Sequence, residues 1–516
     1  MPSINSNTGA LFSVDAARKT DRDMSTAMKR LSTGDRITNA GDDAAGAAIS
    51  DRMMATVRAL DMSIRNAMDV LSMSQVAESA INEHSQALQR IRELSIQAAT
   101  DILNAEQRIY LQTEANQLLE EMDRVARDTT FNEIAVLDGT FADRRFQIGS
   151  HEREKAVISV ANLRIDQLGA YQSNTDIQDA GTADNLAAEG NLGTDATNAA
   201  SLVLDADDLT ITGLVGQATV DVAAGNTAKE IVNLVNDKFD STGVSATATT
   251  TVKLEGLTDS AGSHVVSFNL YGKNTTAQTI SATITLGATT GAADLTGLRD
   301  SFNAYTANTG IRATLSADAT DIILVQDEGE DIVLEEVNFA SVTDANTFFR
   351  MTAMTPDQET STTTQRDVLD ASQANDSVRF SGIVTFHSSQ TFTVEGNGGG
   401  GLYEASPGVA TLNKVGTIDI RTVSGAVDAL KVIDRALDRI HMERAKFGAI
   451  MSRMNVVIDN LTNVSANQKT SMARITDANF ALESAKLSKS QILQQSAMNM
   501  ISQASRTMQN VLILFN

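Results

Sequence analysis

A long heptad pattern near the carboxyl end constrains this chain more than any other feature. Between residues 430 and 461 the apolar residues follow one another at spacings of three and four, and only Arg444 interrupts the row. The row consists of Leu430, Ile433, Leu437, Ile440, Phe447, Met451, Met454, Ile458 and Leu461. Such spacing is the a/d seam of a coiled coil, which is narrower than the apolar stripe of an ordinary surface helix. A helix of this span is roughly 48 Å long at 1.5 Å per residue, so we expect another long helix to lie against it.

A second seam, far away in the sequence, supplies the expected partner. Its positions again follow at spacings of three and four, apart from one extra step of three at Ser74–Ala77. They are Val57, Leu60, Ile64, Ala67, Leu71, Ser74, Ala77, Ile81, His84, Leu88, Ile91, Ser95 and Ala98. We therefore predict that the two ends of the chain pack together as one helical bundle, and that the residues between them are an insertion.

The composition excludes several kinds of chemistry. The 516 residues include no cysteine and no tryptophan, so disulfides, thiolate catalysis and zinc sites with sulfur ligands are ruled out. Five histidines leave little for catalysis or metal binding, and we expect no cofactor. The three prolines, Pro2, Pro356 and Pro407, all lie outside the two seams, which suits long unbroken helices.

Charge divides the chain into two kinds of region. The net charge is −24, and residues 176–410 hold 9 Lys or Arg against 32 Asp or Glu, so nearly all the excess acid lies in the middle. Neutral, periodic ends suit association with copies of the same chain, whereas an acidic middle repels its neighbours and stays in solvent. Nucleic-acid binding is not expected, because phosphate contacts require clustered Lys and Arg.

No segment has the pattern of a membrane anchor. No apolar run approaches the roughly 18 residues of a membrane span, so membrane insertion is not expected. The first twenty residues lack the charged and apolar regions of a cleavable secretory signal. Some export routes read uncleaved termini, so the missing signal does not by itself place the protein in the cytoplasm.

The pattern of elements predicts an α+β multidomain protein. A helix over about 104–128 and a hairpin at Asp138-Gly139 with strand 145–149, followed by a strand at 156–160, would complete the bundle over 43–175 and 411–471. Residues 176–410 read as a β-rich insertion in which a helix followed by a Thr-Gly turn and strands recurs at an offset of 67 residues, at 227–247 and 298–314. Residues 1–42 and 472–516 would be terminal helices, the last of them starting near Met472.

Potential catalytic and metal-binding groups have simpler explanations. The Asp42-Asp43 pair is expected to cap the following helix rather than to act as an acid/base pair, because no histidine or nucleophile stands nearby. The segment His151 to Lys155 lacks the second histidine of a zinc-protease motif. The acidic run Asp327 to Asp331 lacks the spacing of an EF-hand, so a solvated hairpin tip is favoured over a calcium site. We predict that the protein is not an enzyme.

Specific motifs at both ends resemble the bacterial flagellin family. They are Ile4 to Asn7, Arg30 to Met53, Gln89 to Gln97, Phe131-Asn132 with Val136 to Gly139, Ser490 to Ser496 and Gln509 to Leu512. The resemblance covers about residues 1–170 and 415–516, and the insertion repeat is similar to one found in the variable region of some flagellins. The chain departs from the family at its end, Ile513 to Asn516, where relatives commonly carry a leucine-rich tripeptide with Arg or Gly.

The resemblance implies the filament subunit of a bacterial flagellum, which drives swimming motility. Residues 1–42 and 472–516 would form the inner filament core, and the insertion would face outward. The implied self-assembly residues are Leu31, Ile37, Asp42, Asp43, Ile475, Leu482, Ile492, Leu493, Ile501, Val511 and Leu512. The implied partners are other copies of the chain, an export chaperone, and the cap and hook–filament junction proteins. Export would run through the flagellar secretion channel without a cleaved signal peptide, to an extracellular filament.

A further implied partner is the vertebrate innate receptor for flagellin. The residues that match the family's receptor-contact motif are Gln89, Arg90, Leu94, Gln97 and Glu114, and their alternative role is helix surface and seam packing. Two rival functions remain at this point: a hook–filament junction protein, which shares the helical ends, and a flagellin-type subunit whose insertion is an adhesin.

Overall fold

The computed structural model describes residues 8–174, 191–193, 207–223, 225–255, 262–286, 293–316, 321–340, 348–354, 361–369, 377–396 and 408–513. The chain divides into two compact units. Unit 1 comprises Met1–Val76, Ala142–Ser159 and Phe447–Asn516, and unit 2 comprises Ala77–Phe141 and Val160–Lys446.

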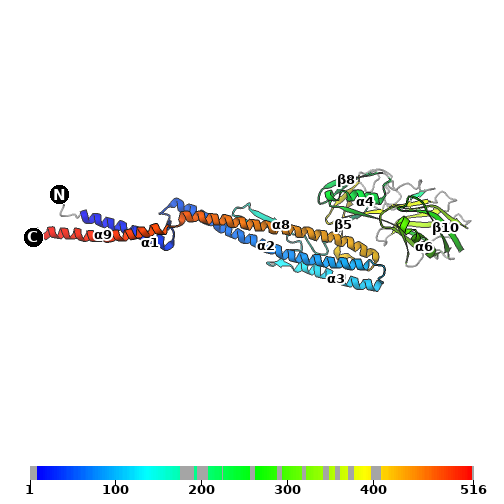
Figure 1. Ribbon diagram of the computed structural model, residues 1–516, viewed down its shortest axis with the longest axis horizontal. Helices are drawn as coiled ribbons and strands as arrows, with labels where there is room; N and C mark the ends of the chain where they lie inside the picture. The colour runs from blue at the N-terminus through cyan, green and yellow to red at the C-terminus, as the bar shows by residue number, and fades with distance from the viewer. Residues whose placement is uncertain are drawn as a thin grey trace. The chain divides into compact units, whose positions relative to one another are not determined.

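Five long helices form the two ends of the chain (Figure 1). They are α1 (Thr8–Thr33), α2 (Ala44–Ala98), α3 (Ala105–Asp128), α8 (Val423–Thr476) and α9 (Phe480–Ile513). Helix α3 begins with a capping box, in which the Asn104 side chain accepts from the Gln107 amide and the Gln107 side chain accepts from the Asn104 amide. Together with the β-rich middle, these helices confirm the predicted α+β architecture.

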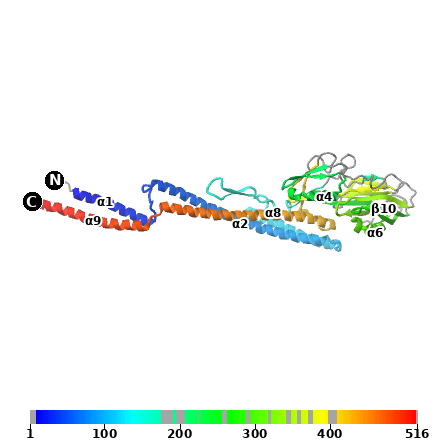
Figure 2. The same ribbon diagram turned by 45° about the horizontal axis from the view of Figure 1, so that its top comes forward.

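In unit 1, the first and last helices lie side by side, as Figures 1 and 2 both show for α1 and α9. Two interruptions of the helices lie next to each other: one follows α1, and the other separates α8 from α9. Gly34 has a φ of +79°, which ends α1 in the left-handed conformation that suits glycine. The Arg36 amide donates to the Thr476 carbonyl at 2.6 Å, and the Ala478 amide donates to the Gly34 carbonyl at 2.8 Å. The predicted start of the last helix near Met472 is therefore wrong by about two turns, because α8 continues to Thr476 and α9 begins at Phe480.

Helices α2 and α8 contact each other within each unit. In unit 1, Asp61 accepts a hydrogen bond from Ser465 Oγ at 2.8 Å and an ion pair from Lys469 Nζ at 3.1 Å. In unit 2, Arg92 Nε donates to Asp434 at 2.7 Å. The predicted docking of the two chain ends is therefore observed.

The predicted seam on α2 is nearly all buried. Eleven of its thirteen positions are buried, and Ile64 and Leu71 are half-buried. On α8, four seam residues are buried: Ile433, Ile440, Phe447 and Met454. The other predicted members are half-buried: Leu430, Leu437, Met451, Ile458 and Leu461. Ala429, Ala436 and Glu443 are also buried. Each stands one residue before a half-buried position of the predicted row, so the buried face is displaced to that side of the seam.

A short hairpin in unit 1 pairs β3 (Arg144–Gln147) with β4 (Lys155–Ile158), in antiparallel register from Arg144 opposite Ile158 to Gln147 opposite Lys155. The two strands are joined through residues 148–154. The prediction that the Asp138-Gly139 pair makes this hairpin turn is therefore wrong. Gly139 does adopt a positive φ of +88°, but it lies in the loop that precedes β3.

Unit 2 contains the β-rich middle of the chain. Its strands are β1 (Thr130–Phe131), β2 (Ile134–Ala135), β5 (Gly169–Asn174), β6 (Asn191–Gly193), β7 (Asp207–Thr212), β8 (Gln217–Val222), β9 (Ser245–Glu255), β10 (Gly262–Tyr271), β11 (Gln278–Leu286), β12 (Ala293–Asp294), β13 (Ile311–Leu315), β14 (Asp321–Gln326), β15 (Ile332–Ala340), β16 (Phe348–Met354), β17 (Ser361–Leu369), β18 (Ser377–Phe380), β19 (Ile383–Ser388), β20 (Thr393–Glu395), β21 (Gly408–Val409) and β22 (Thr411–Lys414). A 3₁₀ turn, η1 (Val415–Thr417), leads from β22 towards α8.

Three larger sheets organise these strands. Their orders are β12-β11-β10-β15-β18-β6, β21-β20-β7-β8 and β13-β14-β9-β19-β5-β22, the last with β16 and β17 attached through β9. The long strand β9 pairs with β19 over its first half and with β14 and β16 over its second half. One buried core contains Phe268 and Phe302, whose ring centroids lie 5.3 Å apart, and a second contains Phe386 and Phe392.

The predicted repeat at an offset of 67 residues is confirmed in detail. In the first copy, α4 (Ala228–Asn236) and α5 (Phe239–Thr242) precede β9; in the second, α6 (Thr296–Ala304) and α7 (Thr306–Thr309) precede β13. In each copy the second short helix ends at a glycine with positive φ: α5 at Gly243, with +72°, and α7 at Gly310, with +75°. The equivalent glycines explain why the Thr-Gly turn was visible in the sequence.

Candidate self-assembly surface

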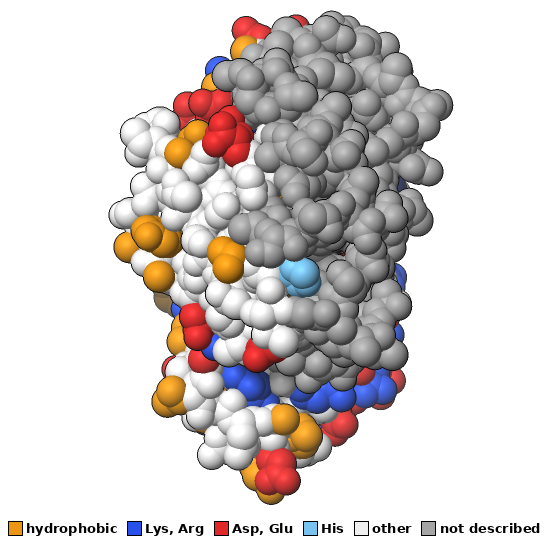
Figure 3. Space-filling view, turned by 90° about the vertical axis from the view of Figure 1, so that its right-hand side faces the viewer, with side chains coloured by type: hydrophobic (Ala, Val, Ile, Leu, Met, Phe, Trp, Pro, Cys, Tyr) orange, Lys and Arg blue, Asp and Glu red, His pale blue; other side chains and the backbone are white. Residues whose placement is uncertain are grey.

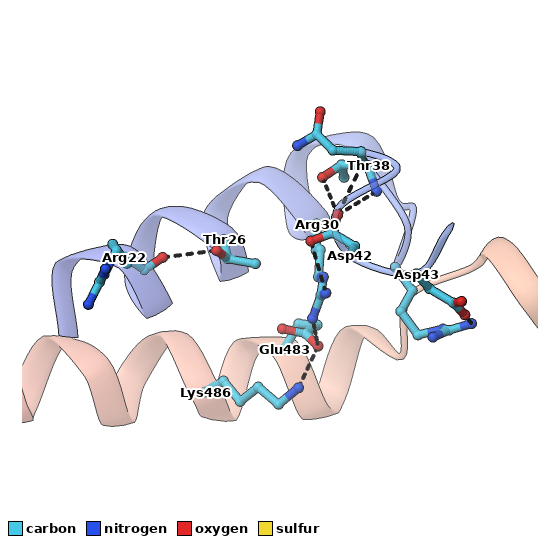
Figure 4. A network of polar contacts seen from close by, with 10 residues as sticks. Arg22, Thr26, Arg30, Thr38, Asp42, Asp43, Glu483 and Lys486 are labelled. Carbon is cyan, nitrogen blue, oxygen red and sulfur yellow. Dashed lines mark hydrogen bonds and ion pairs between the residues drawn. The ribbon is translucent and has the colours of Figure 1, made fainter. Parts of the chain in front are cut away.

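The loop between α1 and α2 is held by one carboxylate. Asp42 Oδ2 accepts hydrogen bonds from the Thr38 amide and hydroxyl, both at 3.0 Å, and from the Asn39 amide at 3.1 Å (Figure 4). These bonds favour the charged form, the Thr38 amide most strongly, and lower the pKa of Asp42 below its ordinary value. Asp42 therefore fixes the bend rather than capping the helix.

The neighbouring carboxylate is the helix cap. Asp43 Oδ1 accepts from the Gly46 amide at 2.9 Å at the start of α2, as the sequence predicted for one of the two aspartates. A side chain on Gly46 would lie 2.4 Å from Asp43 Oδ2 and 2.8 Å from Ile37 Cδ1. Ile37 therefore packs over the first turn of α2 and is half-buried within the subunit.

An ionic network joins α1 to α9 next to this loop (Figure 4). Arg30 lies between Asp42, at 3.7 Å, and Glu483, at 3.5 Å, and Lys486 Nζ donates to Glu483 at 2.7 Å. Glu483 is only 4% exposed, so it is a buried acid that is neutralised by two cations. The loop, the first helix and the last helix are thus tied together at one point.

A groove of about 760 Å³ runs between the two terminal helices. Charged side chains line its part near the network, and Leu493, Ala497 and Met500 line the other part. The charged members are Lys19, Asp23, Arg30, Glu483, Lys486 and Lys489.

Large apolar side chains are exposed along the same two helices. Phe12 is 79% exposed, Phe480 is 68% and Ile492 is 66%. The others are Leu11, Met28, Leu482, Leu493, Met498 and Met500. A pair of helices that leaves so many apolar side chains in water is typical of a surface that becomes covered by another chain.

The predicted self-assembly residues separate into two groups. Leu482, Ile492 and Leu493 are exposed on α9, whereas Leu31, Ile37, Ile475 and Ile501 are half-buried. Val511 and Leu512 belong to α9, but their side chains lie outside the described residues. Among the described aromatic residues of α1 and α9, Phe12 and Phe480 are the most exposed, and both are absent from the predicted set. They were missed because they fall outside the regular apolar spacing of each helix, and that offset was the available signal.

The residues implied for the receptor lie on α2 and α3 in unit 2. Arg90 pairs with Glu114 at 2.7 Å and with Glu93 at 3.0 Å, and Gln89 and Gln97 are also exposed. Leu94 is 1% exposed and is among the largest fully buried side chains. Four of the five residues are therefore available at the surface, and Leu94 packs inside the helical bundle.

The acidic run at 327–331 is a tight connection between β14 and β15. Gly329 has a φ of +77°, and Lys229 neutralises both Glu328, at 2.7 Å, and Glu330, at 3.1 Å. Within the described residues, no group of three or more potential ligands is placed to hold a metal ion. Among those residues, too, no helix is long and apolar enough to cross a membrane.

The surface of the β-rich region differs from that of the terminal helices. Figure 3 shows acidic side chains among white polar surface, with apolar side chains in small, separate groups on the described part of this face. On the described part of this face the apolar groups are separate, whereas exposed apolar side chains follow one another along α1 and α9.

The long terminal helices and their exposed apolar side chains are those of a structural protein. Family models agree: that of the bacterial flagellin N-terminal helical region matches residues 4–142, and that of the C-terminal helical region matches residues 430–515. The model of the flagellin hook IN motif matches residues 208–256, which correspond to the first copy of the repeat.

Whole-chain relatives define the family. The B-type flagellin of Pseudomonas aeruginosa is 30% identical over 513 residues, covering 99% of each chain. The flagellin of Salmonella rubislaw is 30% identical over 528 residues, again covering 99% of each chain. The solved structure of FliC from Burkholderia pseudomallei aligns with 74% of this chain and 99% of its own, at 16% identity and a TM-score of 0.28. On the sequence comparisons alone, the chain belongs to the bacterial flagellin family, and it is a structural subunit of the flagellum.

Proposed function

We propose that this chain polymerises into the flagellar filament through α1 and α9, and that the filament acts as the propeller for swimming. The supporting observation is the set of exposed apolar side chains on these two helices, of which Ile492 is one of the most exposed. Covering such side chains by a neighbouring copy removes apolar surface from water, which is the main driving force of association.

The arrangement supports an open assembly. A contact between different faces of identical subunits generates a helical filament when the rotation does not close. The acidic, β-rich middle of the chain would remain outside such contacts, because like charges on neighbouring copies repel one another. Bistable packing between neighbours would let the filament change its helical form.

This proposal assigns a different position in the filament to each part of the chain. Residues 1–42 and 472–516 form the inner core, residues 43–175 and 411–471 form the surrounding bundle, and residues 176–410 face outward. The chain is exported to the extracellular filament through the flagellar secretion channel without a cleaved signal peptide. Its further partners are an export chaperone, the cap and the hook–filament junction proteins.

Substitution of one exposed apolar residue tests the assembly surface. Ile492→Asp should raise the concentration needed for polymerisation by at least about tenfold, which corresponds to about 1.4 kcal/mol of contact free energy. Val215→Asp is the matched control, because Val215 is 63% exposed but lies between β7 and β8 in the β-rich middle. Electron microscopy of salt-induced polymers gives the readout. Normal filaments formed by Ile492→Asp would refute the assigned surface. If the wild type forms only short assemblies and no long filaments, the alternative of a junction protein is favoured.

We also propose that the exposed surface around Arg90 and Glu114 activates the vertebrate innate flagellin receptor. The supporting observation is that Gln89, Arg90, Gln97 and Glu114 are all exposed on adjoining helices. Arg90→Ala should lower receptor activation in reporter cells, whereas Arg124→Ala, which removes an exposed arginine of α3 paired with Glu121, should not. Equal activation by both variants would count against this surface. Leu94→Ala is a poor probe, because loss of a buried leucine costs about 2–5 kcal/mol of folding free energy.

A further inference from the structure

Methionine is unevenly distributed over the surface of this chain. Among the described residues, all six exposed methionines lie in unit 1: Met28, Met54, Met62, Met68, Met498 and Met500. In unit 2, Met122, Met351 and Met354 are buried. With no cysteine and no tryptophan in the sequence, methionine is the side chain most open to two-electron oxidation.

Three of the six form a column with two arginines on α2. The order is Met54, Arg58, Met62, Arg65 and Met68, at steps of four, four, three and three residues, which return to one side of a helix. All five side chains are exposed. Val57, Leu60, Ser63, Ala67 and Val70, on the other side of the same stretch, are buried. The column is therefore on the outer face of the bundle.

The arginines contact two of the three sulfur atoms. Arg58 Nη2 donates to Met54 Sδ at 3.4 Å, and Arg65 Nη2 donates to Met62 Sδ. A thioether sulfur is a weak acceptor, so these contacts are weak in the reduced protein. An oxygen bound to the same sulfur would be a strong acceptor placed within reach of a guanidinium group. Met68, with similar exposure, has no such arginine contact among the described residues.

We propose that this methionine–arginine column is an oxidation-sensitive contact face for a second copy of the chain. The inference rests on the proposed function, since it takes the apolar surface of unit 1 to be covered on assembly. In the reduced state the thioethers offer an adaptable apolar surface to the neighbour. In the oxidised state the column becomes polar, and its arginines are occupied by their own sulfoxides.

The chemical step requires only a peroxide. The sulfur lone pair attacks one peroxide oxygen, the S–O bond forms as the O–O bond breaks, and the remaining oxygen leaves as water after proton transfer. The thioether loses two electrons and the peroxide gains them. Methionine sulfoxide reductases reverse the change, so the face can be restored.

Two sets of leucine substitutions separate this column from the other exposed methionines. Leucine replaces methionine with little change in volume and cannot form a sulfoxide. The first full-length variant is Met54→Leu, Met62→Leu, Met68→Leu, and the matched control is Met28→Leu, Met498→Leu, Met500→Leu. Each protein is treated with hydrogen peroxide as a monomer, freed of peroxide and then induced to polymerise.

Peroxide should slow polymerisation of the wild type and the control by at least about tenfold, a change equivalent to about 1.4 kcal/mol. The α2 variant should lose clearly less of its polymerisation rate than the wild type, because only Met28, Met498 and Met500 among the exposed methionines can still be oxidised in it. Sulfoxide reductase should rescue the wild type. If the α2 variant is as peroxide-sensitive as the wild type, the proposal is wrong. If the untreated wild type forms no filaments, it is the proposed function that fails.

A second measurement does not depend on the variants. Mass spectrometry of peroxide-treated wild type should show Met54, Met62 and Met68 oxidised in the monomer and at least about tenfold more slowly in the filament, a factor equivalent to about 1.4 kcal/mol. Met122, which is buried in unit 2, should be protected in both states. Equal oxidation of the column in monomer and filament would overturn the assignment of a contact face.

Discussion

Asn303 and Ala313 are joined by a reciprocal pair of hydrogen bonds, each of 2.9 Å: the side-chain amide of Asn303 donates to the Ala313 carbonyl, and its oxygen accepts from the Ala313 amide. Asn236 and Ala246 repeat this pairing 67 residues earlier, at 3.2 and 2.9 Å. One side chain thus locks a short helix to the strand that follows it, twice in the same chain.

Removing either asparagine should loosen its own copy of the repeat. Asn303→Ala leaves the Ala313 amide and carbonyl without their partners, so it should cost about 1–3 kcal/mol. Hydrogen exchange should show faster exchange in β13 for Asn303→Ala and in β9 for Asn236→Ala. Loss of protection in both strands from one substitution would contradict independent locks.

The buried seam of α8 gives a second prediction. Ile440→Ala removes a side chain with no exposed surface and should cost about 2–5 kcal/mol, as is usual for a cavity in a core. Val456→Ala is the control on the same helix, because Val456 is 66% exposed and its truncation should change stability by less than about 0.5 kcal/mol. Urea unfolding measures both. Equal effects would place Ile440 outside the core.

Gly41, in the loop between α1 and α2, and Gly46, in the first turn of α2, should respond differently to substitution. Gly46→Ala places a methyl group against Asp43 and Ile37, so it should disturb the cap of α2 and cost about 1–3 kcal/mol. Gly41→Ala meets nothing within 4 Å and should be nearly neutral. Thermal unfolding of the two variants gives the comparison, and a destabilised Gly41→Ala would show that the loop is constrained in another way.

Asp331, which is largely buried, and His387, which is buried, should have opposing effects on stability as pH changes. Burial raises the pKa of Asp331 to about 6, and burial, assisted by Lys431 and Arg435, lowers the pKa of His387 to about 3. Between the ordinary aspartate value of 3.8 and about 6, Asp331 binds more proton in the folded state, so its contribution to stability falls as pH rises. His387 binds less proton in the folded state from about 3 up to 6.5, so its contribution rises with pH over that window.

The two slopes should largely cancel in the wild type between pH 4 and 6. His387→Gln should leave a free energy of unfolding that falls across this interval, and Asp331→Asn should leave one that rises. The expected slopes are up to about 1.4 kcal/mol per pH unit in each case. Urea unfolding at several pH values measures them, and the same slope in both variants would show that other groups dominate.

The long helices and the repeat could be predicted from sequence because each depends on local periodicity. The α2 seam was identified almost completely, since spacings of three and four continue through its whole length. The α8 seam was only half correct, because Ala436 and Glu443 carry no hydrophobic signal although packing buries them. The pairing of β3 with β4 was missed because Asp138-Gly139 is a stronger hairpin signal than any pair of residues in the longer connection at 148–154.

The candidate surface was predicted only in part. The prediction failed where the contacts join residues that are far apart in the sequence. Leu482, Ile492 and Leu493 were expected from the resemblance to the flagellin family. The network of Arg30, Glu483 and Asp42 joins residues more than 400 positions apart, and no local pattern reports such a contact. The arginine contacts at Met54 and Met62 depend on side-chain directions that spacing only suggests.

The paired breaks at Gly34 and Asp477 have a mechanical consequence. Main-chain hydrogen bonds join the two non-helical connections to each other at this level. Neither terminal helix can therefore tilt there without moving the other. A bend at this joint would therefore swing α1 and α9 as one lever, and torque applied to either would be shared by both.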